Sequence, residues 1–208
     1  DCGMYQERQF ASRNWEPLAV DPKEIDAVFL THAHLDHCGL LPKLCKDGFD
    51  GKIYGTSATC EIARIILLDS AKLQVEDAAY KNKRHQKEGR DMPEAKPLYT
   101  IEEAEASFGN FSPVPYRSEI VINDRVKATL YNAGHVLGSS IIRLKVLDAD
   151  QERIIIFSGD IGRVNRPIVC DPAVFDEADY VLVESTYGDR VHNNITDIKS
   201  LIADTIND

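Results

Sequence analysis

Three histidines and one aspartate lie within residues 32–37, in the order His32, His34, Asp36 and His37. Imidazole nitrogens and carboxylate oxygens are the ligands that zinc and related divalent ions take in proteins. Because alternate residues of an extended segment share a face, His32 and His34 can point in the same direction. Asp36 and His37 begin a turn and can approach from another side. This pattern favours two adjacent metal ions over one, and metal binding over a polar loop with coincidental histidines.

The segments on either side of this cluster must position it. Residues 27–30 are apolar, β-branched and aromatic, which predicts a short buried strand. Residues 40–44 predict the opening of a helix. The cluster therefore lies at a strand-to-helix turn, where several side chains can converge on one point.

Two further polar residues follow later strands. His135 lies in a Gly-His-x-x-Gly-Ser segment, and Asp160 follows Ser-Gly directly after the apolar residues 154–157. Taken singly, a core histidine and a turn-forming aspartate are the ordinary interpretations. Both residues, however, stand at strand ends, from which a sheet can direct side chains toward the histidine cluster.

The remaining pattern mixes helices with strands. Thr56 and the residues after it predict a capped helix whose core stripe is Ile62, Ile65, Ile66 and Leu68. Thr100 and Glu103 form a capping box for a helix over residues 100–107. Strands are predicted over residues 52–55, 118–122, 126–131, 140–147, 153–157 and 180–183. The class is therefore α/β or α+β, with a largely antiparallel run in the middle.

Composition indicates the size of the domain, the redox state of the cysteines and the absence of a predicted membrane segment. The 208 residues suffice for one sizeable domain, and 43% hydrophobic and 28% charged residues are ordinary for a globular protein. Five cysteines without a C-x-x-C pair predict reduced thiols in a cytoplasmic protein. Cys38, next to His37, is expected to be a buried, inert thiol. No apolar run is long enough to cross a bilayer, and the first residues lack a signal-peptide pattern.

The formal net charge of −10 argues against non-specific binding of nucleic acid over the whole surface of the chain. It does not exclude a nucleic-acid substrate, because bound metal ions add local positive charge. The basic residues within 81–90 are better interpreted as a solvated helix face than as a phosphate-contacting rim, since acidic residues are interleaved nearby.

The H-x-H-x-D-H pattern after a strand resembles the signature of the metallo-β-lactamase superfamily of hydrolases. The segments that end in His135-x-x-Gly-Ser and Ser-Gly-Asp160 resemble its third and fourth motifs. The resemblance implies an αββα sandwich and a site with two zinc ions. It assigns the first zinc to His32, His34 and His135, the second to Asp36 and His37, and the bridging position to Asp160. It also makes Asp1, in the opening Asp-Cys-Gly, a residue that orients the site.

Residues 183–192 resemble the segment that leads into the β-CASP insertion, which marks the nucleic-acid-cleaving branch of this superfamily. This branch includes the mRNA 3′-end processing nuclease subunit and RNase J-like proteins. The resemblance implies that Glu184 orients a histidine, beyond residue 208, that protonates the leaving group. It also implies that Asp36 accepts a proton from the attacking water. His192 is a further, weaker candidate for the site.

By the same resemblance, residues 1–183 form a metallo-β-lactamase domain that lacks its first strands, and residues 184–208 begin a β-CASP domain. We expect that the chain continues beyond both ends and that this portion is inactive alone. The implied reaction is hydrolysis of RNA phosphodiester bonds by two-metal chemistry. No membrane is expected as a partner, and a homodimer is compatible with the sequence. Endonuclease or 5′-exonuclease action, and RNA or DNA preference, stay open.

Two rival interpretations remain. One is a hydrolase of a small thioester or lactam built on the same fold, against which residues 184–192 argue. The other is a non-catalytic scaffold subunit of an RNA-processing complex. A scaffold would be expected to have lost metal ligands, whereas every ligand that the resemblance implies within this sequence is present.

Overall fold

The computed structural model describes residues 1–89, 91–149, 151–189 and 198–207, so His192 lies outside the described residues. The helices are α1 (Leu35–Cys38), α2 (Leu41–Lys46), α3 (Ser57–Lys87), α4 (Ile101–Ser107) and α5 (Ile198–Asn207), with 3-10 turns at Ala11–Trp15, Pro22–Glu24 and Phe108–Asn110. The strands are β1 (Ala27–Phe29), β2 (Lys52–Gly55), β3 (Phe111–Pro113), β4 (Glu119–Asn123), β5 (Val126–Asn132), β6 (Ser140–Asp148), β7 (Gln151–Phe157) and β8 (Tyr180–Leu182).

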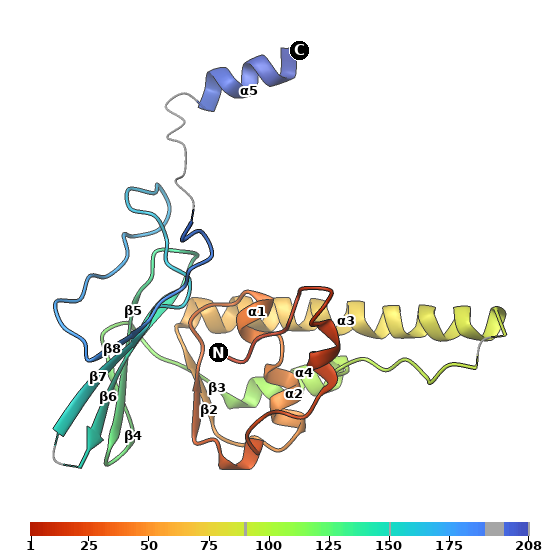
Figure 1. The fold of residues 1–208 in the computed structure, drawn as a ribbon, viewed down its shortest axis with the longest axis horizontal. Coiled ribbons are helices and arrows are strands. Elements are labelled where there is room, and N and C mark those ends of the chain that lie inside the picture. The colour runs from red at the N-terminus through yellow and green to blue at the C-terminus, as the bar shows by residue number, and fades with distance from the viewer. Residues whose placement is uncertain (90, 150, 190–197, 208) are drawn as a thin grey trace.

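The strands form two sheets, which Figure 1 shows side by side. The first sheet is parallel, in the order β1-β2-β3, and the second follows the order β4-β5-β6-β7-β8. Neighbouring strands of the second sheet run antiparallel, except for the parallel pair β7 and β8. This arrangement matches the mixed class and the antiparallel run expected from the sequence.

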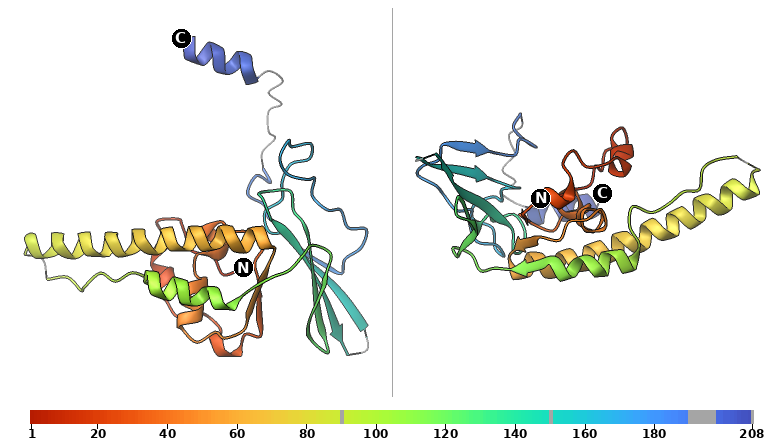
Figure 2. Two further views of the ribbon diagram at one scale, coloured as in Figure 1. Left: turned by 180° about the vertical axis from the view of Figure 1, so that it is seen from behind. Right: turned by 90° about the horizontal axis from the view of Figure 1, so that it is seen from below.

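Helices α2, α3 and α4 cover the face of the first sheet that points away from the second sheet (Figures 1 and 2). Register explains this layer, because Val28, Ile53 and Phe111 are paired neighbours across the three strands and all are buried. They pack against Leu41 and Leu67 from the helices. The described residues thus form one helical layer and two sheet layers of the expected αββα sandwich.

Helix α3 begins where the sequence predicts, since the Thr56 hydroxyl accepts a hydrogen bond from the Thr59 backbone N–H. The predicted core stripe was wrong at one position. Ile65 is 69% exposed, whereas Ala63 and Leu67 are fully buried. Ile65 lies half a turn from these two residues and therefore faces solvent instead of the sheet.

The far half of α3 projects from the body of the domain (yellow in Figure 1). The chain returns along it as an extended segment. Asn82 fastens this segment, because its side-chain amide donates to the Ala95 carbonyl and its oxygen accepts from the Ala95 N–H. The charged residues of the projection are solvated, as the exposed pair of Lys81 and Asp77 illustrates.

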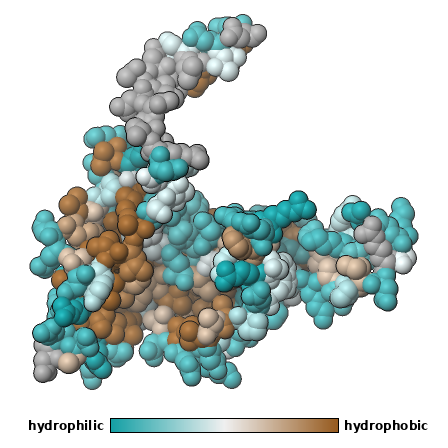
Figure 3. Space-filling model, viewed as in Figure 1, coloured by the Kyte–Doolittle hydropathy of each residue, from teal (hydrophilic) through white to brown (hydrophobic). Residues whose placement is uncertain are grey.

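A cavity of about 760 Å³ opens between parts of the two sheets. Its walls are largely apolar and include Val28, Phe29, Leu144 and Phe157. Apolar side chains also reach the surface over β8, whose three residues are each more than half exposed, and Figure 3 shows apolar surface on this side of the molecule. No helix among the described residues is both long and apolar enough to span a membrane.

Candidate metal centre

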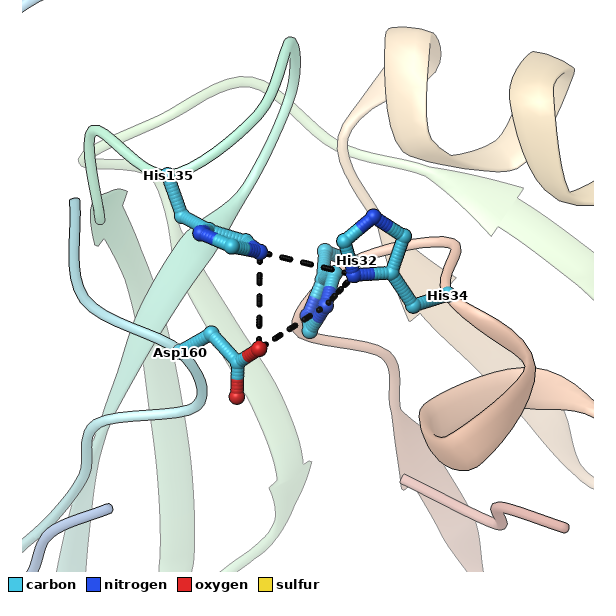
Figure 4. A group of neighbouring side chains, drawn as sticks. All are labelled: His32, His34, His135 and Asp160. Atoms are coloured by element: carbon cyan, nitrogen blue, oxygen red, sulfur yellow. Dashed lines mark hydrogen bonds and ion pairs between the residues drawn. The ribbon is translucent and has the colours of Figure 1, made fainter. Parts of the chain in front are cut away.

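Four polar side chains that lie at strand ends of the two sheets meet at one point (Figure 4). His32, His34, His135 and Asp160 each offer one ligand atom, and these atoms all lie within 4.8 Å of one another. His32 Nε2 lies 2.9 Å from His34 Nδ1 and 3.6 Å from Asp160 Oδ2. His135 Nε2 lies 3.4 Å from both of these partners. The sequence predicted all four residues, although they are separated by up to 128 positions.

These separations fit a divalent ion. In a tetrahedral site with metal–ligand bonds of about 2.05 Å, the ligand atoms lie about 3.3 Å from one another. Polar groups that only form hydrogen bonds need not all surround one point. Four of the six separations among these atoms run from 2.9 to 3.6 Å, and all six are within 4.8 Å. The donor set and its spacing therefore imply a metal ion at this point.

Burial favours the neutral imidazoles that metal binding requires. His32 is fully buried in the centre of the cluster. Burial, followed by the charges of the neighbouring histidines His37, His34 and His135, lowers the pKa of His32 to about 2. At neutral pH its Nε2 lone pair is consequently not lost to protonation.

The four residues of the cluster lie at the ends of strands. His32 and His34 follow β1, and His34 is the N-terminal cap position of α1. His135 lies in the turn between β5 and β6, and Asp160 follows β7. The two sheets are tied together next to the cluster, because the Thr31 carbonyl accepts hydrogen bonds from the Ser140 backbone N–H and hydroxyl. Thr31 was not singled out from the sequence.

Asp160 also faces a second group of residues. Its Oδ1 lies 3.3 Å from His37 Nε2, while its Oδ2 faces the first cluster. Asp36 Oδ2 lies 3.8 Å from the same His37 nitrogen. The structure therefore places His37 beside the Asp160 oxygen that does not face His135, and places Asp36 next to His37.

Asp1 anchors this second group. Its Oδ1 accepts from the Thr31 backbone N–H at 2.7 Å, and its Oδ2 accepts from the Thr31 hydroxyl at 2.8 Å. Oδ2 also lies 2.8 Å from His37 Nδ1. Because an ionised carboxylate only accepts hydrogen bonds, Nδ1 must carry the proton, which leaves His37 Nε2 free to bind a metal.

Glu184 lies at the same end of the cavity as Asp1, His37 and Asp160. Its Oε1 accepts from the Ile161 backbone N–H at 2.6 Å, and its Oε2 accepts from the Thr186 hydroxyl. Ile161 directly follows Asp160, so Glu184 holds the segment that carries this carboxylate.

Cys38 is not part of the donor set. Its Sγ donates to the Ala33 carbonyl, and the side chain is fully buried. Burial, helped by the negative charge of Asp36, raises the pKa of the Cys38 thiol to about 12. All five cysteines are free.

Comparisons with known proteins agree with this geometry. A family model described as "Metallo-beta-lactamase superfamily domain" matches residues 1–159. Ribonuclease TTHA0252 of Thermus thermophilus is 36% identical over 192 residues, which are 92% of this chain and 38% of that protein. RNase aCSPSF2 of Saccharolobus solfataricus is 32% identical over 193 residues, which are 91% of this chain and 34% of that protein.

Among solved structures, a B3 metallo-β-lactamase with an active-site glutamic acid has a TM-score of 0.45 and 16% identity, over 78% of this chain and 53% of that chain. The chain spans less than two fifths of the length of the two ribonucleases. The ribonuclease relatives agree with the resemblance to the β-CASP branch, and the matched domain covers the four histidines of the centre and ends one residue before Asp160. The chain belongs to the metallo-β-lactamase superfamily.

Proposed function

We propose that this chain carries the two-zinc centre of a hydrolase that cleaves RNA phosphodiester bonds. The observation that carries the proposal is the convergence of His32, His34, His135 and Asp160 from two sheets on one point. Relatives named as ribonucleases support RNA as the substrate class. Their matches span about nine tenths of this chain.

The count of two zinc ions rests on Asp160. One carboxylate oxygen faces the three histidines of the first cluster, and the other faces His37. A carboxylate placed in this way suits a bridge between two ions. We assign His32, His34 and His135 to the first ion, and Asp36 and His37 to the second. Nitrogen and oxygen donors of this kind are typical zinc ligands, although they also accept other divalent ions.

When bound, the metal ions supply a water activated at neutral pH and positive charge for the phosphoryl oxygens. The protein side chains supply the proton acceptor and orient the ligands. The Asp36 side chain is 51% exposed beside the cluster and can accept a proton from the attacking water. Asp1 fixes the ring of His37, and Glu184 holds the segment that carries Asp160. Glu184 is also half-buried next to the site, which suits the proposed role of orienting a further acid.

We assign residues 1–183 to the metallo-β-lactamase domain and residues 184–208 to the start of a β-CASP domain. Strand β8 ends at Leu182, so this boundary falls just after the last strand of the second sheet. Five free thiols favour a reducing compartment, and we infer that the protein acts in the cytoplasm.

Metal content tests the centre. Zinc per chain is measured by plasma mass spectrometry after purification without chelators, for the parent and for His135→Ala. About two zinc ions in the parent, and fewer in the variant, are expected. One ion in the parent would contradict the bridged pair, and no zinc in either protein would reject the hydrolase assignment.

Cleavage tests the substrate. The full reading frame that carries this chain is incubated with end-labelled RNA and with DNA of the same sequence. We expect metal-dependent cleavage of RNA that stops when a chelator is added. A zinc-loaded protein that hydrolyses a thioester or lactam but leaves both nucleic acids intact would refute the nuclease assignment.

A further inference from the structure

We propose that Thr59, with Thr56 beside it, is a positioning residue that sets the place of His135 in the metal centre. The inference rests on the proposed role of His135 as a ligand. His135 comes from the second sheet, whereas His32 and His34 come from the first. The distance between these ligands therefore depends on contacts that cross from one sheet to the other.

The N-terminus of α3 makes such a contact. The hydroxyls of Thr56 and Thr59 each donate to the Gly138 carbonyl, both at 2.8 Å. Thr56 also accepts from the Thr59 backbone N–H at 3.1 Å, so the cap of α3 and this contact share one hydroxyl. Both threonines are buried. Gly138 is itself half-buried, so the two hydroxyls hold its carbonyl in a partly shielded position, and losing one donor weakens this contact.

Gly138 is shaped for this contact. Its φ of +83° lies in the region that favours glycine, and a Cβ there would lie 2.7 Å from the Thr56 hydroxyl and from the Thr59 nitrogen. The carbonyl therefore approaches the helix terminus as closely as a backbone without a side chain allows. Such an approach fixes the turn in position as well as in direction.

Hydrogen bonds within the turn between β5 and β6 connect Gly138 to His135. Within it, the backbone N–H groups of His135 and Val136 both donate to the Ser139 hydroxyl, at 3.1 and 3.2 Å. The Ser139 N–H returns a bond to the Val136 carbonyl, and the Tyr116 hydroxyl donates to the Ser139 carbonyl. The turn is thus internally bonded and moves as one piece, so an anchor at Gly138 also restrains His135.

A matched pair of substitutions isolates the Thr59 hydroxyl. Thr59→Ser keeps the hydroxyl, and Thr59→Ala removes it, while the two variants otherwise differ by no heavy atom. Zinc affinity is measured for the full reading frame that carries this chain, by competition with a chromophoric chelator. Cobalt(II) absorption reports the coordination geometry independently. We expect Thr59→Ala to bind zinc about 10-fold to 100-fold more weakly with an altered cobalt spectrum, the range seen for groups that orient ligands. Thr59→Ser should keep the parent values.

Thr100→Ala is the control for stability. Thr100 caps α4 with its hydroxyl, in the same way as Thr56 caps α3, but contacts no residue of the centre. This variant should lower the melting temperature without changing zinc affinity. A loss of affinity in Thr100→Ala equal to that in Thr59→Ala would mean that general destabilisation causes the effect, and would overturn the proposal.

His135→Ala separates this inference from the proposed function. If His135→Ala loses zinc affinity and Thr59→Ala does not, the metal centre stands and the positioning role is wrong. Equal losses in Thr59→Ser and Thr59→Ala would also overturn the role, because the hydroxyl would not be the cause. If His135→Ala itself binds zinc as the parent does, the assignment of this ligand fails, and with it the reason for the anchor.

Discussion

The Asp1 carboxylate holds His37 by its Nδ1 at 2.8 Å, while His37 Nε2 on the other side of the ring lies 3.3 Å from Asp160. This carboxylate–imidazole pair fixes both the tautomer and the direction of the ring. Asp1 is itself fixed by two donors of Thr31. Asp1 therefore orients the ring of a residue 36 positions later.

Asp1→Asn should weaken the second metal site and spare the first. An amide has only one acceptor atom, so its NH2 group must face the Thr31 N–H or the His37 N–H. We expect zinc content to fall from two toward one, with affinity for the second ion reduced about 10-fold to 100-fold. Calorimetric titration of the metal-free protein measures both sites. Asp21→Asn, at the exposed cap of a 3-10 turn, is the control; loss of both ions in Asp1→Asn would contradict the assignment.

Asp36→Ala should abolish RNA cleavage in the full reading frame without unfolding the protein. Its side chain is half exposed and lies at the rim of the centre, so truncation leaves no cavity in the core. A lost proton acceptor costs about 100-fold or more in rate. Cleavage rates and melting temperatures are compared with those of Asp50→Ala, which changes an exposed aspartate in the loop before β2. Cleavage at the parent rate by Asp36→Ala would exclude its catalytic role.

Much of this centre could be predicted from the sequence, because its chemistry is concentrated at strand ends. His32, His34 and His37 share one short segment, and His135 and Asp160 follow apolar runs that a sheet must align. The capping box of Thr100 and Glu103 was also confirmed, since it depends only on residues three positions apart. A single sequence shows directly only the spacing of residues that are close together along the chain.

Contacts that depend on the packing of distant elements were not predicted. The bonds from Thr56 and Thr59 to Gly138 join residues about 80 positions apart, and either threonine alone is an ordinary helix cap. Strand β3 was missed because three residues with a terminal proline carry little strand signal. Ile65 was assigned to the core because an apolar run does not reveal which of its residues faces the sheet.

Substitutions of Glu184 can separate its role in holding the Asp160 segment from its proposed role in orienting a further acid. Its Oε1 accepts from the Ile161 N–H beside Asp160, and a glutamine can keep this acceptor. Glu184→Ala should weaken zinc binding about tenfold, the value of one lost hydrogen bond of about 1.4 kcal/mol. Glu184→Gln should keep zinc affinity, and should lose cleavage if the charge orients a further acid. Glu177→Ala, an exposed change in the same region, is the control. Unchanged zinc affinity in Glu184→Ala would contradict the holding role.

Removal of metal should lower the melting temperature. An ion that binds only the folded state at 100 times its dissociation constant stabilises it by about 2.7 kcal/mol. For a chain of this size, that corresponds to a shift of about 5–10 °C. Differential scanning fluorimetry with and without a chelator measures the shift. His34→Ala, which removes an exposed ligand of the first ion, should show a smaller shift on chelation than the parent. A parent protein that is indifferent to chelation would argue against a bound structural ion.

The cysteines should differ sharply in reactivity. Burial raises the pKa of Cys45 and Cys60 to about 11 and, with the charge of Asp36, that of Cys38 to about 12. A raised pKa lowers the thiolate fraction, so at pH 8 about one molecule in a thousand or fewer carries a thiolate at these positions. Cys170 is exposed and should react rapidly with a disulfide reagent. Burial also raises the pKa of the half-buried Cys2 thiol. We therefore expect one fast thiol in the native protein and five after denaturation, with the fast phase absent in Cys170→Ser. Rapid modification of Cys38 would show that the segment behind His37 opens readily, and would contradict a rigid metal centre.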